Sequence, residues 1–181
     1  FDAYEGWVDA KQISKISEDD FAQKTSQILT EDFKFFNFKE GKILLSIGSE
    51  VPSNEEKPLP EATGKSLSET AQRFLNVPYL WSGRSFFGID CSGFTQLVFK
   101  VHGIQLPRDA YQQAEVGNVL DFVEESEPGD LAFFENEVGK ISHVGIMLED
   151  QKIIHAYGKV RIDMLDSTGI FNKDLGKHTH K

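Results

Sequence analysis

YLWSGRSFFGIDCSG, residues 79–93, holds the only cysteine of the chain, at the point where a loop should become a helix. Gly88 and Asp90 are residues typical of a turn and of a helix N-cap. Beyond Cys91, apolar residues follow the i, i+3, i+4, i+7 spacing of one buried helical face and stop before a glycine that can end the helix: Phe94, Leu97, Val98, Val101 and Gly103. The spacing predicts a helix that begins at Cys91.

The position of Cys91 indicates a nucleophile. Unpaired backbone N–H groups and the helix macrodipole favour a negative charge in the first turn, so we expect a lowered thiol pKa. A lone cysteine is more often a small buried hydrophobic residue. A structural thiol does not need the Gly-, Ser- and Asp-rich loop before it, and Gly93 behind it indicates that something approaches the backbone closely.

These residues resemble a known family. Asp90-Cys91-Ser92-Gly93, preceded by residues 79–83, is similar to the NlpC-type papain-like cell-wall peptidases. The Gly83-Arg84-Ser85 segment with Gly88-Ile89 resembles the γ-D-glutamyl-L-diamino-acid endopeptidases in particular. The resemblance extends from about Leu67 to the C-terminus and implies an α+β, papain-like fold with helices packed on an antiparallel sheet.

Two histidines lie in predicted strands over residues 141–148 and 152–156. Either one alone is more often a core residue, but the order Cys91, His143, His155 matches the family's nucleophile, base and orienting residue. If residues 149–151 form the loop, His155 pairs opposite Gly145 and shares a face with His143. A two- or four-residue loop would separate them. The other histidines are placed at a helix end, His102, and in a polar tail without a predicted closing strand, His178 and His180.

The resemblance also implies a substrate, the peptidoglycan stem peptide L-Ala-γ-D-Glu-diamino acid, with meso-diaminopimelate and L-Lys both open. It assigns Asp90 and Ser92 to a free N-terminal amine, and we expect Cys91 to act as a thiolate beside an imidazolium. The Cys91 N–H and the Tyr79 side chain are candidate oxyanion donors. Three further residues are expected to line the cleft, although the first could instead pack in the core: Trp81, Arg84 and Ser85.

Other functions stay open at this point. A related Cys–His amidase that cuts between sugar and peptide would not need an amine-binding Asp90. A non-catalytic wall-binding module would not need Cys91, His143 and His155 together. One cysteine and two histidines lack the close spacing of metal ligands, so no metal and no cofactor are expected.

The chain divides into two parts, residues 1–62 and 63–181. Tyr4-Glu5-Gly6-Trp7-Val8 resembles the late strand of bacterial SH3-like barrels, so residues 1–62 are expected to hold a truncated or reduced SH3-like β region with its linker. An isolated hairpin on the main domain is the alternative. A helix should start at residues 17–20, strands are predicted at 33–38 and 42–48, and the proline-rich residues 51–65 have linker composition. Ser66 or Ser68 should then cap a helix that ends before Pro78.

Composition narrows the class of protein. A net charge of −10 argues against nucleic acid and anionic membrane surfaces as partners, and 39% hydrophobic residues can supply a core. No apolar run approaches the roughly 18 residues of a membrane-spanning helix. We expect a monomer in the cell envelope, with the cytoplasm as the alternative because recycling relatives work there.

Overall fold

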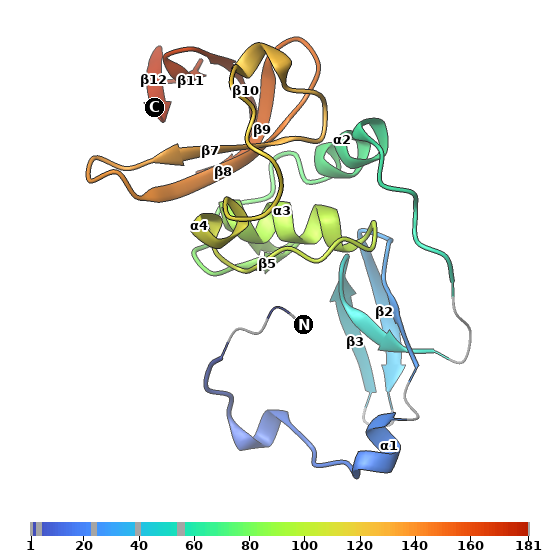
Figure 1. The fold of residues 1–181 in the computed structure, drawn as a ribbon. Helices are drawn as coiled ribbons and strands as arrows, with labels where there is room; N and C mark the ends of the chain where they lie inside the picture. The colour runs from blue at the N-terminus through green and yellow to red at the C-terminus, as the bar shows by residue number, and fades with distance from the viewer. Residues whose placement is uncertain (1, 3–4, 23–24, 39–40, 54–56, 181) are drawn as a thin grey trace.

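The computed structural model describes residues 2, 5–22, 25–38, 41–53 and 57–180, and its centre is a six-stranded antiparallel sheet. The strands lie in the order β12-β11-β10-β9-β8-β7 (Figure 1). Their bounds are Leu131–Glu135 (β7), Ile141–Met147 (β8), Lys152–Tyr157 (β9), Lys159–Asp166 (β10), Gly169–Asn172 (β11) and Lys177–His180 (β12). The predicted antiparallel sheet is confirmed.

Three helices cover this sheet: α2 (Gly64–Gln72), α3 (Cys91–Lys100) and α4 (Ala110–Gln113). The helix predicted from Cys91 is confirmed, and its apolar face packs with Ile146 and Ile154 of the sheet in one core. A second core lies on the other face of the sheet and comprises Phe134, Met147, Ile153, Leu165 and Ile170. Alternate residues of each strand therefore serve different cores, as the period of two requires.

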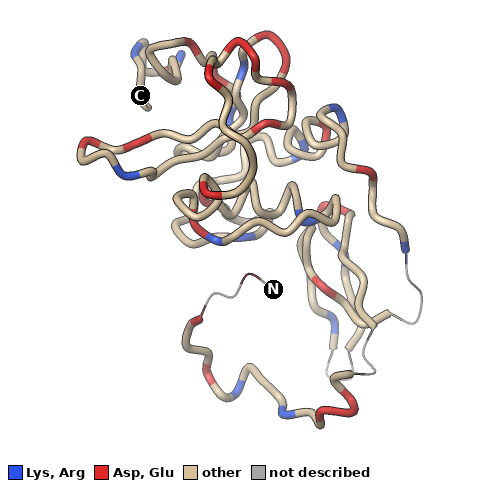
Figure 2. The backbone as a smooth tube through the Cα atoms, in the orientation of Figure 1, with Lys and Arg blue, Asp and Glu red and all other residues tan. Residues whose placement is uncertain are grey.

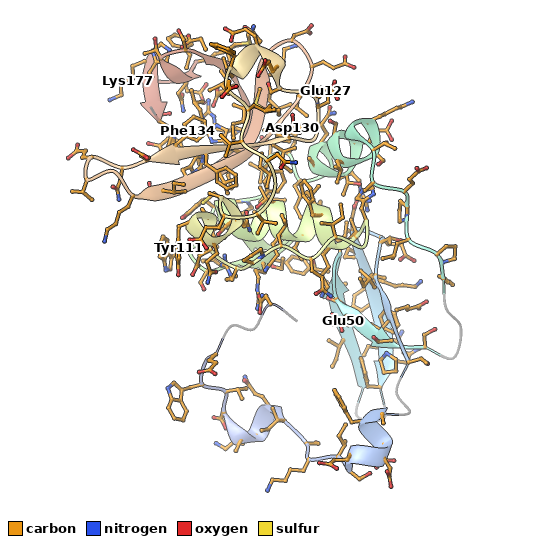
Figure 3. All side chains as sticks on the ribbon, in the orientation of Figure 1. Glu50, Tyr111, Glu127, Asp130, Phe134 and Lys177 are labelled. Carbon is orange, nitrogen blue, oxygen red and sulfur yellow. The ribbon has the colours of Figure 1, made fainter. Side chains whose placement is uncertain are left out.

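The sheet is strongly curled. β7 and β12 are its two edge strands, yet the ring centroids of Phe134 on β7 and His180 on β12 are 5.9 Å apart. The two edges thus approach each other around the second core. Figure 3 shows β12, marked by Lys177, beside the sheet on the side where Phe134 lies. The prediction that the C-terminal tail has no closing strand was wrong, because residues 177–180 pair with β11.

The hairpin of β8 and β9 has the expected register. Gly145 pairs with His155, and Leu148 N–H donates to the Lys152 carbonyl at 2.8 Å, so residues 149–151 form the loop. A Cβ atom on Gly145 would lie 2.9 Å from the Cβ of His155 and 2.7 Å from the Ile153 side chain. Glycine is therefore required opposite the histidine.

The cap predicted for α2 was wrong. Thr63, and neither Ser66 nor Ser68, is the N-cap: its hydroxyl accepts from Ser66 N–H, and the Ser66 hydroxyl accepts from Thr63 N–H. Ser66 is thus the third residue of the capping box, where a polar side chain can reach back. The helix ends at Gln72, and the buried Phe74 lies in the turn that follows.

The N-terminal part contains α1 (Glu18–Ala22) and four short strands, β1 (Ser26–Ile28), β2 (Phe33–Phe38), β3 (Gly41–Ser46) and β4 (Glu50–Pro52). They form two separate pairs, β2 with β3 and β1 with β4. The predicted helix start and both predicted strands are confirmed. The Glu50 carboxylate lies 2.8 Å from Lys100 Nζ at the end of α3, and Glu50 is labelled beside that helix in Figure 3. The SH3-like assignment of residues 1–62 and the boundary at residue 63 stay predictions.

The strand expected at residues 4–8 was wrong over the residues described there, and Tyr4 lies outside them. Residues 5–8 form no strand, and Trp7 is fully exposed. Asp9 instead caps a 3-10 turn, Ala10–Gln12, by accepting from Lys11 N–H. An extended segment becomes a strand only when a neighbour supplies the other half of the ladder.

Positively and negatively charged residues are spread along the chain, on loops as well as on helices and strands (Figure 2). Acidic side chains outnumber basic ones by 29 to 19. Within the described residues, none of the helices combines the length and apolar character needed to cross a membrane.

Candidate active site

The loop before α3 delivers Cys91 to the helix start. It forms the short pair β5 (Arg84–Ser85) and β6 (Gly88–Ile89), and Asp90 then caps α3 by accepting from Gly93 N–H at 2.7 Å. A Cβ on Gly93 would lie 2.5 Å from the Gly83 carbonyl oxygen. The expected close approach at Gly93 is therefore made by this loop itself, and any larger residue would push the loop away from the thiol.

Asp90 and Ser92, predicted to bind a free amine, are buried and already paired. Arg108 donates to Asp90 Oδ2 at 2.5 Å, to Asp90 Oδ1 at 3.1 Å and to the Ser92 hydroxyl at 2.9 Å. The cation that balances the carboxylate beside Cys91 is thus a guanidinium of the protein. Arg108 was not assigned to the site from the sequence, because its place in Leu106-Pro107-Arg108 gives no indication of a partner.

The Cys91 thiol is 8% exposed and packs against Ala110 and Val144. Burial raises the pKa of this thiol, and the Asp90 carboxylate raises it further, while backbone N–H groups oppose the shift. The predicted lowering of the Cys91 pKa by the helix start was therefore wrong. Burial outweighs the helix dipole here, because a buried thiolate loses more hydration free energy than it gains from the partial positive charge at the helix start.

A pH series of alkylation tests this correction. We expect iodoacetamide to react slowly with Cys91 at neutral pH, and the rate to rise with a midpoint above the ordinary thiol value of 9.0, because only the thiolate attacks. Mass spectrometry of the single cysteine gives the rate. A midpoint below neutral pH would mean that the free protein already holds a thiolate–imidazolium pair.

The two predicted strand histidines meet. His143 Nε2 and His155 Nδ1 lie 2.8 Å apart, and their rings stand at 82°. Both side chains are buried, and burial lowers the pKa of each below its usual value. His143 shares a cavity of about 350 Å³ with Cys91. Because Nε2 is bound to His155, Nδ1 is the His143 atom left for the thiol.

A carboxylate continues this chain, and the sequence reading missed it. His155 Nε2 lies 3.2 Å from Asp163 Oδ2, and Arg161 donates to both oxygens of Asp163. A carboxylate only accepts, so His155 carries its proton on Nε2 and accepts at Nδ1 from His143 Nε2–H. His143 Nδ1 then has a free lone pair. The sequence signal that could have indicated Asp163 is Arg161-Ile162-Asp163, which places two opposite charges on one face of a buried strand.

Replacing Asp163 with asparagine tests this tautomer chain. The amide can donate to His155 and reverse both tautomers, so we expect kcat for a cleaved substrate to fall about 100-fold with little change in KM. Asp174→Asn is the matched control, because Asp174 also binds Arg161, at 2.9 Å, but is 72% exposed at the surface. Equal activity of the two variants would contradict a role for Asp163.

A third histidine completes the cluster. The His180 ring stacks on the His143 ring, with centroids 4.0 Å apart and an interplanar angle of 20°. His180 was assigned to a polar tail, which was wrong, because β12 folds back into the site. Among the described residues, one nitrogen from each of His143, His155 and His180 lies within 4.8 Å of the others, close enough for a metal ligand set. Both nitrogens of His155 and Nε2 of His143 are already hydrogen-bonded, as described above.

The remaining predicted residues divide into two groups. Tyr79 lines the cavity that holds Cys91, together with residues of β8, β9 and β12. The expected cleft residues do not line it. Trp81 is 83% exposed, which excludes core packing, Arg84 contacts Asp2 and Gln96, and the Ser85 hydroxyl accepts from Phe87 N–H within its own turn.

A buried thiol at a helix start, in one cavity with the first histidine of a His-His-Asp chain on an antiparallel sheet, defines a papain-like fold with a candidate cysteine peptidase site. The chain belongs to the NlpC/P60 family, which matches residues 76–178.

Two curated relatives carry the name γ-D-glutamyl-L-lysine dipeptidyl-peptidase. The one from Bacillus cereus (strain ATCC 10987 / NRS 248) is 38% identical over 123 residues, 65% of this chain and 37% of that protein. The one from Bacillus subtilis (strain 168) is 41% identical over 130 residues, 69% of this chain and 42% of that protein. This chain thus spans about two fifths of the length of these relatives.

A solved structure of an NlpC/P60 family protein from Bacillus cereus ATCC 10987 has a similar fold. Its TM-score is 0.78 at 25% identity, and the match covers 97% of this chain and 68% of that one.

Proposed function

We propose that this protein is a cysteine endopeptidase that hydrolyses the γ-D-Glu–diamino-acid bond of peptidoglycan stem peptides. The observation that carries the proposal is the 2.8 Å contact between His143 Nε2 and His155 Nδ1 in a cavity shared with Cys91. A nucleophile, a base and a group that orients the base are the parts that acyl transfer needs.

The reaction starts from a neutral thiol and a neutral imidazole. His143 Nδ1 takes the Cys91 proton as Sγ bonds to the scissile carbonyl carbon. The tetrahedral intermediate collapses, the C–N bond breaks, and His143 gives its proton to the leaving amine. Water then attacks the thioester with His143 again as base, which releases the γ-D-Glu carboxylate and restores the thiol.

His155 and Asp163 support the proton transfers. While His143 is an imidazolium, its Nε2–H donates to His155, and the Asp163 carboxylate keeps the His155 proton on the far nitrogen. The backbone N–H of Cys91 and the hydroxyl of Tyr79 are the proposed oxyanion donors, and removing one such donor typically costs about 2.7–4 kcal/mol of transition-state stabilisation.

The substrate is the finer part of the proposal, and the names of the two curated relatives support it. A dipeptidyl-peptidase releases two residues from a free amino end, which for a stem peptide are L-Ala and γ-D-Glu. We therefore propose a requirement for a free N-terminal amine. Because the Arg108 guanidinium is hydrogen-bonded to Asp90 and Ser92, this amine would have to displace the guanidinium or bind elsewhere in the cavity. We propose that this reaction belongs to cell-wall turnover in the envelope, with recycling in the cytoplasm as the alternative.

Hydrolysis of four defined peptides tests the proposal. L-Ala-γ-D-Glu followed by meso-diaminopimelate or by L-Lys is offered with a free and with an N-acetylated alanine, and Cys91→Ala is the blank. Cleavage of the free-amine forms alone, lost in the variant, is the expected result. Equal cleavage of the acetylated forms would overturn the proposed requirement for a free amine, but the proposed peptidase activity would stand.

Two outcomes would replace the proposal. Release of the intact stem peptide from a muramyl-peptide, without cleavage of the γ-bond, would show the amidase. Binding of peptidoglycan fragments without cleavage of any substrate would show a wall-binding module.

A further inference from the structure

The C-terminal strand carries His180 into the site, where its ring covers the base. The His180 and His143 centroids are 4.0 Å apart, and the rings are tilted by 20°. Phe134, at 6.0 Å, and His155, at 5.0 Å, contact the same His143 ring from other directions. The imidazole of His143 is thereby confined on several sides, and it is only 5% exposed.

His180 is itself fixed in place. Its Nδ1 lies 3.0 Å from the Thr179 hydroxyl, its ring meets the Tyr157 ring edge-on at 4.9 Å, and its backbone pairs with Ile170 of β11. It lines the cavity that contains Cys91 and His143. The ring therefore separates one face of the base from solvent at the wall of the cavity.

We propose that His180 is a positioning residue of the peptidase: its ring holds the His143 imidazole in the plane in which Nδ1 faces Cys91 and excludes water from that ring. This inference rests on the proposed function. A ring free to rotate about its side-chain bonds would often point Nδ1 away from the thiol, and misplacement of a catalytic group by about 1 Å can cost about 100-fold in rate.

The charge state of His180 fits this role. The pKa of His180 is lowered to about 4, mainly by burial and also by His155, against the opposing effect of Asp163, so the ring is uncharged at neutral pH. A cation stacked on His143 would oppose the imidazolium that catalysis requires. Several titratable or charged groups face this pair from the surrounding elements: Cys91 on α3, His155 and Tyr157 on β9, and Arg161 and Asp163 on β10.

Two variants distinguish a role of the His180 ring in positioning His143 from a role in folding alone. His180→Ala removes the ring, and His180→Phe keeps an aromatic ring of similar size without nitrogens. For the best-cleaved stem peptide, measured in EDTA so that no metal bridges the histidines, we expect kcat to fall about tenfold in the alanine variant with KM nearly unchanged. In the alanine variant, the acid limb of the pH profile of kcat/KM should move to higher pH, because exposing the His143 ring to water raises its pKa. The phenylalanine variant should recover most of kcat and keep the acid limb at or below its wild-type position.

A second measurement does not depend on hydrolysis. In the Cys91→Ala background, NMR titration of the His143 ring should give a higher pKa for His180→Ala than for the parent and for His180→Phe. A loss of melting temperature in His180→Ala without any change in the His143 pKa or the acid limb would overturn the proposal. Absence of all hydrolysis in the wild-type protein would refute the proposed function, whereas the titration would still decide the role of His180 in holding His143.

Discussion

Replacing Cys91 with alanine is expected to lower kcat for the stem peptide by at least about 10³-fold, because it removes the only thiol of the chain and with it the proposed acyl intermediate. The cavity is lined by Tyr79, Ser142, His143 and His180 among others, and none of these is a thiol. A mass increase equal to the L-Ala-γ-D-Glu acyl group, trapped by acid quench in the wild-type protein, should be missing from the variant.

The fold should tolerate this change. Cys91 packs against Ala110 and Val144, so the alanine leaves a cavity smaller than a methylthiol group. Cys91→Ser, which keeps the shape, is the second control: its hydroxyl is a far weaker acid, and we expect it to be nearly as inactive. Substantial hydrolysis by either well-folded variant would mean that the nucleophile is not Cys91.

Replacing Arg108 with methionine is expected to lower the free energy of unfolding by about 3–5 kcal/mol, because it leaves the Asp90 carboxylate buried without its cation. Both side chains are almost inaccessible, at 6% and 9% exposure, and the pair is bidentate. Urea unfolding at neutral pH, followed by circular dichroism, measures the loss.

The double variant Asp90→Asn/Arg108→Met is the matched test. Asparagine can still cap α3 through Gly93 N–H and carries no charge, so it should restore a large part of the lost stability. Lys152→Met, which breaks an exposed pair with Asp150 at 3.1 Å, should cost no more than about 1 kcal/mol. If Arg108→Met lowered the free energy of unfolding no more than Lys152→Met does, the buried pair of Arg108 and Asp90 would not support the loop that holds Cys91.

Local patterns predicted the parts of this protein that depend on neighbouring residues. The spacing of apolar residues after Cys91 determines one face of α3, and Asp90 with Gly93 determines where that helix begins. The three-residue loop between β8 and β9 sets the register that joins His143 to His155. Each of these follows from backbone geometry over a few residues, which is why the sequence alone was sufficient.

Local reasoning failed where a partner lies far away in the chain. The pKa of Cys91 depends on burial under β8 and on the Asp90 charge, so the helix start alone gave the wrong direction. Residues 4–8 resemble a strand, yet no described segment pairs with residues 5–8. Thr63 is an exception, because its partner Ser66 is only three residues away, and it was overlooked because Ser66 and Ser68 offered equally plausible patterns.

The sequence by itself therefore determined the helix that presents the thiol, the β-hairpin that presents the base, and the family to which both belong. Only the tertiary structure decided what surrounds them. Asp163 reaches His155 from the neighbouring strand β10, Arg108 reaches Asp90 from a loop, and His180 reaches His143 from the edge strand β12. The last contact exists because the sheet curls until its two edges meet, and the curl is a collective result of strand twist and core packing that no short stretch encodes.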